Sequence, residues 1–147
     1  MHFTLASVAR FWFFWFVGCL LMSWLSGWWL LARRYGEAAP PQRWRHIFAS
    51  GSLARARWPA IQYHATFFLA WNEQGLTLAV FFPVRLAHAR LHLPWPTVSA
   101  VRRVPWLGLW QQTEIQFEQG RYRLRLRGRA GIQAFNAAQQ QQAGCGP

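Results

Sequence analysis

The stretch EIQFEQGRYRLRLR, residues 114–127, predicts a β-hairpin and, with it, a β-rich domain. Apolar and polar residues alternate on both sides of Gln119-Gly120, a pair that suits a two-residue turn. With Glu118 opposite Arg121, apolar residues meet on one face and Glu meets Arg on the other, solvent-facing one, which favours this register. The remaining expected pairs are Phe117 with Tyr122, Ile115 with Leu124, Gln116 with Arg123 and Glu114 with Arg125.

Five segments upstream also have the residue pattern of strands, being rich in aromatic residues or alternating between apolar and polar ones. They are residues 44–50, His64–Trp71, Leu76–Phe82, Leu91–Trp95 and Val98–Val104, with Asn72–Gly75 as a hairpin loop. Downstream, Ile132, Phe135 and Ala138 form an apolar stripe on a short helix. This order predicts an α+β protein with a strongly bent antiparallel sheet or partial barrel, capped by the C-terminal helix. A pleckstrin-homology-like (PH-like) arrangement fits that order, and a β-sandwich is the alternative.

At the other end of the chain, the 22 residues Phe11–Ala32 contain no charged side chain. As one helix they would be about 33 Å long, enough for a hydrocarbon core of about 30 Å. Tryptophans crowd towards the ends of this run, and Arg33-Arg34 follows it, as is typical of a membrane anchor. The expected interface anchors are Trp12, Trp15, Trp28, Trp29, Arg33 and Arg34. A cleaved signal peptide is the alternative, but its apolar core would be shorter and a small-residue cleavage site would follow it.

Arginines flank the apolar run unequally, with one before it and many after it. Because positive flanks stay in the cytoplasm, we expect the C-terminal domain to be cytoplasmic and the anchor to cross a bacterial inner membrane once. The expected organisation is an extracytoplasmic N-terminus (1–10), a transmembrane helix (11–32), a linker (33–43), a β-rich domain with its C-terminal helix (44–138) and a disordered tail (139–147).

The composition restricts the chemistry that the domain can perform. All 16 basic residues are Arg, Lys and Asp are absent, and there are four Glu. From Arg33 onward, 15 Arg and four Glu leave a formal charge of +11 beside an anionic leaflet. Cys19 lies within the apolar run and Cys145 in the tail, so no disulfide framework is expected.

Three segments resemble a group of small, uncharacterised proteobacterial single-pass membrane proteins. That group has an SGW…LA…Y segment at the end of its anchor, a GLYL strand start and an HPPLxIPW stretch. The matching positions here are Ser26-Gly27-Trp28 with Leu31-Ala32 and Tyr35, then Gly75–Leu78, then His88–Trp95. This chain departs from the pattern at Thr77 and at Ala89-Arg90. The resemblance implies the architecture and no particular chemistry.

The alternating arginines after the turn are the main candidate binding surface. If the strand continues, they share one face over about 26 Å. They are Arg121, Arg123, Arg125, Arg127 and Arg129. Such a face would bind anionic lipid headgroups or an acidic protein partner, and the alternative is a solvated face partly neutralised by Glu114 and Glu118. Nucleic acid is not expected as a ligand, because Tyr122 points away from the arginines and leaves them without stacking aromatic residues.

Small residues recur along the apolar run and would let a second helix approach closely. They are Cys19, Ser23, Ser26 and Gly27. This stripe favours a homodimer or a membrane-protein partner bound through the transmembrane helix, and the alternative is that the small residues recur by chance.

No catalytic set, metal site or cofactor is expected. His88 and His92 have neither Cys nor acid beside them, so a structural or surface role is favoured over metal binding. The acids available for proton transfer are few, and two of them already pair with Arg in the expected hairpin. The sequence thus favours a membrane-anchored, non-enzymatic binding or scaffold protein, such as an accessory subunit of an inner-membrane complex. The alternative is a PH-like sensor of anionic lipid headgroups.

Overall fold

The computed structural model describes residues 5–36, 43–55, 60–81, 84–106 and 110–144. They form three α-helices, two short 3-10 helices and seven strands within these ranges. The elements are α1 (Leu5–Ser26), α2 (Trp28–Tyr35), β1 (His46–Arg55), β2 (Ile61–Trp71), β3 (Gly75–Val80), η1 (Val84–Ala87), β4 (Leu91–Pro94), η2 (Trp95–Thr97), β5 (Val98–Trp106), β6 (Trp110–Phe117), β7 (Tyr122–Arg127) and α3 (Gly128–Gly144).

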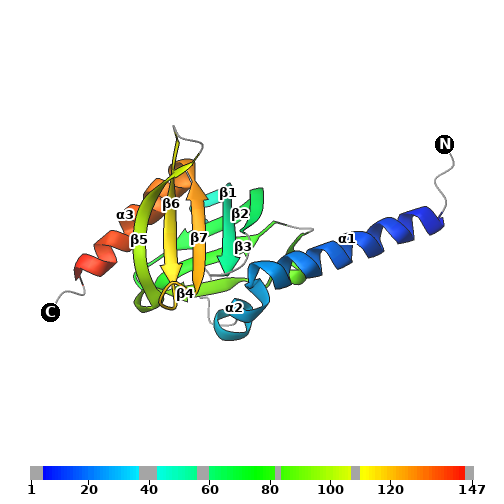
Figure 1. The fold of residues 1–147 in the computed structure, drawn as a ribbon, viewed down its shortest axis with the longest axis horizontal. Coiled ribbons are helices and arrows are strands. Elements are labelled where there is room, and N and C mark those ends of the chain that lie inside the picture. The colour runs from blue at the N-terminus through cyan, green and yellow to red at the C-terminus, as the bar shows by residue number, and fades with distance from the viewer. Residues whose placement is uncertain (1–4, 37–42, 56–59, 82–83, 107–109, 145–147) are drawn as a thin grey trace.

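The strands form one antiparallel sheet in the order β4-β3-β2-β1-β7-β6-β5, curled into a half-barrel (Figure 1). The apolar faces of the strands enclose the core, and α3 packs against β5, β6 and β7. At another side of the core, α2 and the C-terminal half of α1 pack against β1, β4 and η1. The structure therefore confirms the α+β class, the bent antiparallel sheet and the C-terminal helix.

The hairpin of β6 and β7 has the register that the sequence predicts. Phe117 pairs with Tyr122, Ile115 with Leu124, Gln116 with Arg123 and Glu114 with Arg125. The strands end at Phe117 and resume at Tyr122. Across Gln119-Gly120, which both have positive φ as the expected two-residue turn requires, the Arg121 amide donates a 3.2 Å hydrogen bond to the Glu118 carbonyl oxygen. Glu118 and Arg121 thus lie opposite each other as expected, but their expected charge pair is wrong, since the Glu118 carboxylate accepts hydrogen bonds from Arg34 and Tyr35 on α2.

The first strand is longer and more irregular than the sequence indicates. Residues 51–55 belong to β1, although the sequence pattern predicts this strand over residues 44–50. A Cβ at residue 51 would lie 2.3 Å from the Arg125 carbonyl oxygen, so only glycine lets β7 approach this closely. Register shifts interrupt the pairing of β1 with β2 near Phe48, whose φ is +59°.

The apolar run is not one continuous helix, which corrects the expected span of residues 11–32. α1 ends at Ser26, and Gly27 turns the chain with a φ of +79°. α2 then folds back, so that Trp28 and Leu31 are fully buried in the domain core. The break has a packing cause: a Cβ at residue 27 would lie 2.9 Å from a ring carbon of Tyr122.

The C-terminal helix also differs from the prediction. α3 extends to Gly144, beyond the expected end of the helix at residue 138, so the expected disordered tail is helical over residues 139–144. Its buried face consists of small residues, because only short side chains fit between this helix and the sheet: Ala130, Gly131, Ala134 and Ala138. Ile132 is 49% exposed, so the expected apolar stripe is wrong at that position.

Candidate functional site

The first element, α1, has two halves with different surroundings. All twelve residues Leu5–Phe16 are exposed around the whole helix, and Figure 1 shows this half projecting from the domain. Cys19, Ser23 and Ser26 are buried against the domain. α1 is the one candidate membrane span within the described residues, apolar and long enough to cross, and it lies near the N-terminus.

A buried polar cluster joins α1 to the domain. The Tyr63 hydroxyl lies 3.2 Å from Ser26 Oγ and 3.0 Å from His88 Nε2, and His88 Nδ1 lies 2.9 Å from the Val84 carbonyl oxygen. Burial lowers the pKa of His88 to about 4 and raises the pKa of Tyr63 to about 12. Both side chains are therefore neutral at pH 7. The cluster is closed to solvent, so it holds the anchor in place and is not available to a substrate.

The small residues expected to meet a second helix are placed by the structure against the chain's own domain. Ser26 contacts Tyr63, and a Cβ at residue 27 would meet the ring of Tyr122 and the side chain of Arg55. Trp28 Nε1 donates a hydrogen bond of 2.8 Å to the Ala89 carbonyl oxygen, which ties the start of α2 to the segment before β4. A second helix that used this stripe would have to displace these contacts.

His88 and His92 both make contacts that support the fold. His88 belongs to the cluster at the joint, and His92 Nδ1 lies 3.0 Å from the hydroxyl of Thr77 on the neighbouring strand. Burial lowers the pKa of His92 as well. The described residues contain no group of three or more His, Cys, Asp or Glu side chains that could hold a metal ion.

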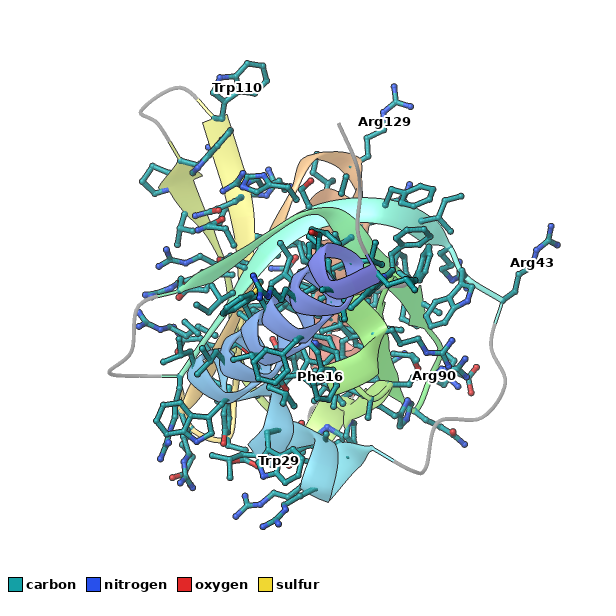
Figure 2. All side chains as sticks on the ribbon, turned by 90° about the vertical axis from the view of Figure 1, so that its right-hand side faces the viewer. Phe16, Trp29, Arg43, Arg90, Trp110 and Arg129 are labelled. Carbon is teal, nitrogen blue, oxygen red and sulfur yellow. The ribbon has the colours of Figure 1, made fainter. Side chains whose placement is uncertain are left out.

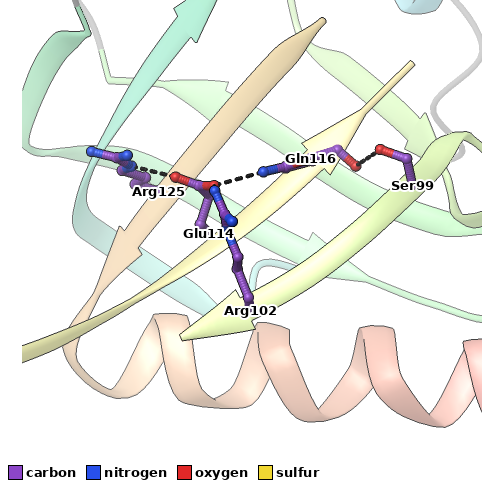
Figure 3. A network of polar contacts seen from close by, with 5 residues as sticks. All are labelled: Ser99, Arg102, Glu114, Gln116 and Arg125. Carbon is purple, nitrogen blue, oxygen red and sulfur yellow. Dashed lines mark hydrogen bonds and ion pairs between the residues drawn. The ribbon is translucent and has the colours of Figure 1, made fainter. Parts of the chain in front are cut away.

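Glu114 lies at the centre of a charged network on the outer face of β5, β6 and β7, drawn in Figure 3. Its Oε1 accepts hydrogen bonds from Arg102 Nε (2.9 Å), Arg102 Nη2 (2.6 Å) and Gln116 Nε2 (2.8 Å). Its Oε2 accepts one from Arg125 Nε at 2.7 Å. Burial would raise the pKa of Glu114, but the hydrogen bonds from Gln116, Arg125 and Arg102 outweigh it and lower the pKa to about 2.

This network corrects the expected role of Glu114. The sequence assigns Glu114 to a solvent-exposed pair with Arg125, whereas the carboxylate is fully buried and Arg102 is a second partner. The reason lies in the sheet order, because β5 pairs with the free side of β6 and sets Arg102 directly opposite Glu114. Two arginines are thus committed to one acid.

The five alternating arginines do not share one strand face. Arg121 precedes β7, and Arg129 lies in the first turn of α3, because the strand ends at Arg127. Arg127 also has partners that the sequence did not indicate. Its Nη2 donates a 2.7 Å hydrogen bond to Gln62 Oε1, and its guanidinium lies 4.1 Å from the ring centroid of Trp106.

At this end of β7 the structure forms a pocket of about 370 Å³ that combines arginines with indole rings. We call it the basic pocket; its lining includes Arg103, Trp106, Trp110, Arg127, Arg129 and Ile132. None of its lining residues is acidic. Trp110 and Arg129 are exposed and point away from the body of the domain in Figure 2. Guanidinium groups bind carboxylates and phosphates through paired hydrogen bonds, and indole rings add apolar contact area, so the pocket suits an anionic group on an apolar stem.

The basic pocket lies at the end of β7 opposite to the anchor. Tyr122, at the start of β7, touches Gly27 at the turn between α1 and α2. Arg127 ends the same strand five residues later, a distance of about 17 Å. Figure 1 shows β5, β6 and β7 on the side of the domain away from the projecting half of α1.

The expected interface anchors divide into two groups. Trp12, Trp15 and Trp29 are exposed, and the Arg33 guanidinium lies 5.0 Å from the ring centroid of Trp29. Trp28 is fully buried in the core, which corrects its expected place at the membrane surface. Arg34 forms a 2.8 Å ion pair with Glu118, because α2 folds back against the turn between β6 and β7.

Sequence reasoning missed Arg103, Trp106 and Trp110 as parts of a site. They belong to a hairpin, β5 with β6, whose second strand begins four residues earlier than the pattern indicates. The polar run Gln111-Gln112-Thr113 conceals this start, because its residues do not alternate between apolar and polar. The paired tryptophans on either side of Gly108 were the one available signal.

Comparisons of this chain with protein-family models, with curated proteins and with solved structures give no match. Within the residues that the structure describes, the fold and the site define an α+β protein with one candidate membrane helix and a basic pocket. The resemblance to small proteobacterial membrane proteins stays a prediction.

Proposed function

We propose that this chain is a membrane-anchored, non-enzymatic scaffold protein whose basic pocket binds an acidic segment of a partner protein. In this proposal α1 crosses the inner membrane of a bacterial cell and the domain lies in the cytoplasm, as the arginine imbalance predicts. The observation that carries the proposal is the basic pocket, which places Arg103, Arg127 and Arg129 beside two indole rings with no acid among its lining residues.

Committed charges elsewhere support the choice of this pocket. Arg102 and Arg125 neutralise Glu114, and Arg34 neutralises Glu118. Arg129 is exposed on the first turn of α3 and is available to a carboxylate of a partner. The same commitments support a non-enzymatic role, because each of these two carboxylates already accepts hydrogen bonds from the chain itself.

A PH-like sensor of anionic lipid headgroups is the second candidate, and the charge of +11 after the apolar run favours it. The position of the pocket favours a protein partner instead. The pocket opens at the end of β7 away from the anchor joint, on the side of the domain away from projecting α1. A lipid headgroup would have to reach past the sheet to enter it.

The test is a titration of the full-length protein in mild detergent with a fluorescein-labelled oligoglutamate peptide, followed by fluorescence anisotropy. Arg129→Gln should weaken binding about fivefold, since one exposed charge pair contributes about 1 kcal/mol, and added salt should weaken it further. Arg121→Gln is the matched control, because Arg121 is also exposed but lies at the opposite end of β7. Absence of peptide binding, together with direct binding of glycerophosphoglycerol in isothermal titration calorimetry that Arg129→Gln weakens, would favour the lipid sensor. Equal losses in both variants would mean that the attraction is not specific to the pocket.

A further inference from the structure

An exposed aromatic patch on the outer face of β1, β2 and β3 has no role in the function proposed above. Its rings touch one another: the Phe48 centroid lies 5.7 Å from Phe68 and 5.4 Å from Phe81, and Phe68 lies 5.7 Å from Trp44. Exposure remains high, at 60% for Ile47, 50% for Phe48 and 42% for Phe81. The aromatic patch consists of Trp44, Ile47, Phe48, Phe68 and Phe81.

The backbone is strained where it presents this patch. Phe48 sits at a register shift of β1 with a φ of +59°, a conformation that costs a bulky side chain on the order of 1–3 kcal/mol. The bulge turns the ring outward, onto Phe68 and Phe81, instead of into the core. The patch is thus built by a specific backbone feature.

Arginines stack on Trp44 of the patch and on Trp71, which ends β2. The Arg90 guanidinium lies 5.2 Å from the ring centroid of Trp44, and that of Arg45 lies 5.2 Å from the ring centroid of Trp71. Exposed apolar rings beside Arg and Trp are the composition of a surface at the boundary between lipid and water.

The length of free helix supplies the decisive constraint. Arg10 bounds the uncharged part of α1, and the exposed residues that follow it, Phe11–Phe16, rise about 9 Å, whereas the hydrocarbon core needs about 30 Å. To complete the crossing, residues 17–26 must also lie at bilayer depth. Yet Cys19, Ser23 and Ser26 on that segment pack against the domain, while Leu20, Leu21 and Trp24 remain exposed on its other side. The part of the domain beside these residues therefore has to enter the membrane as well.

The aromatic patch lies close to that part of the domain. Phe81 directly follows β3, and η1, three residues later, packs against α1. Figure 2 looks at the molecule from the side on which α1 projects, and Arg43 and Arg90 lie together on one side of the helix. Trp29, stacked with Arg33, lies below the helix in the same view.

From the length of free helix and the strained, exposed rings we infer that the domain is seated in the bilayer that α1 crosses, with the aromatic patch inserted at its interface. The inference goes beyond partner binding at the basic pocket and depends only on α1 as the membrane span. Lipid acyl chains and headgroups cover Ile47, Phe48 and Phe81, and the bordering arginines contact headgroup phosphates. The basic pocket then stays free on the far side of the domain.

The test uses the full-length protein with Cys19 and Cys145 replaced by Ser, reconstituted into vesicles of phosphatidylethanolamine and phosphatidylglycerol. Spin labels are attached to single variants Phe48→Cys, Phe81→Cys and Ile47→Cys, and their collisions with oxygen and with a water-soluble nickel chelate are measured. The matched control is Ile132→Cys, which is similarly exposed but lies on α3. The label on Phe13→Cys, in the projecting half of α1, reports whether the anchor itself is in lipid.

The inference requires a ratio of oxygen to nickel accessibility that is several-fold higher at the patch positions than at Ile132→Cys. Patch labels as accessible to nickel as the control would overturn it, and a lipid signal at Phe13→Cys in the same samples would show that α1 still crosses. Patch labels shielded from both reagents would also overturn it, since a protein surface or a second copy would then cover the rings. Three patch positions keep the test decisive if the strained Phe48 site does not tolerate a label, and far-ultraviolet circular dichroism of each variant verifies its fold.

Discussion

Replacement of Glu114 by Gln should destabilise the domain strongly at neutral pH. The carboxylate is fully buried and accepts four hydrogen bonds, three of them from Arg102 and Arg125. These contacts lower its pKa from an ordinary 4.5 to about 2. At 1.36 kcal/mol per pKa unit, the ionised form contributes about 3 kcal/mol to the free energy of unfolding at pH 7. An amide keeps the shape of the side chain but loses one acceptor and the charge.

The direction in which the free energy of unfolding changes with pH follows from the lowered pKa of Glu114. Because the folded state lowers the pKa of Glu114, the stabilisation is fully present above the unfolded pKa of about 4.5. It is lost as the pH falls from about 4.5 to about 2, since the unfolded state then binds the proton more readily. The difference in unfolding free energy between the natural protein and Glu114→Gln should therefore shrink over this window.

The assay is urea unfolding of the full-length protein in mild detergent, followed by near-ultraviolet circular dichroism at several pH values. Glu73→Gln is the control, because Glu73 is exposed in the turn between β2 and β3 and its loss should change the free energy of unfolding by less than about 0.5 kcal/mol. Equal stability of Glu114→Gln and the natural protein at pH 7 would refute the reasoning. A difference that persists unchanged at low pH would refute the part played by the charge.

The same network changes what is expected of the paired arginines. As a partner of a solvent-exposed acid, Arg125 would contribute only about 0–1 kcal/mol. Its side chain is only 34% exposed and its partner is buried, so Arg125→Gln should cost about 1–3 kcal/mol by removing one of the charges that hold Glu114 ionised. The Arg102 side chain is 56% exposed but holds the same carboxylate with two hydrogen bonds, so Arg102→Gln should cost a similar amount.

Three further outcomes test other parts of the structure. Gly27→Ala should destabilise the protein by about 1–2 kcal/mol, because the φ of residue 27 is positive and the ring of Tyr122 occupies the space that a Cβ would need. Gly18→Ala is the control: a Cβ there would meet nothing within 4 Å, so thermal unfolding should show unchanged or higher stability. His88 should make the protein less stable in acid, because its pKa in the folded state, about 4, lies below its ordinary value of 6.5. The free energy of unfolding should therefore fall as the pH drops from about 6.5 to about 4, and His88→Gln should remove this dependence. Because the arginine imbalance predicts a cytoplasmic domain, a C-terminal green fluorescent protein fusion should fluoresce and a C-terminal alkaline phosphatase fusion should be inactive. The reverse result would overturn the predicted orientation.

Local patterns determined the hairpin register and the class of the fold. In residues 114–127 the side chains of two strands are near neighbours in sequence, so alternation alone specifies which residues face each other. The apolar helix near the N-terminus was equally visible, because a run of uncharged residues needs no tertiary partner to be recognised. The strands preceding the hairpin were located to within a few residues, except where Gly51 and the polar start of β6 broke the pattern.

Only the tertiary structure decided which charged groups are buried and which surfaces are open. Glu114 reads as a surface acid in its own hairpin, and it becomes buried because β5 brings Arg102 from a different hairpin to its other side. Gly27 reads as part of one long helix, but the ring of Tyr122, 95 residues later, requires a glycine with positive φ at the turn. Long-range contacts of this kind depend on how the sheet curls, which is set by the packing of the whole core and not by any single segment. The basic pocket and the aromatic patch arise in the same way, from residues of separate strands that meet only when the sheet has closed around its core.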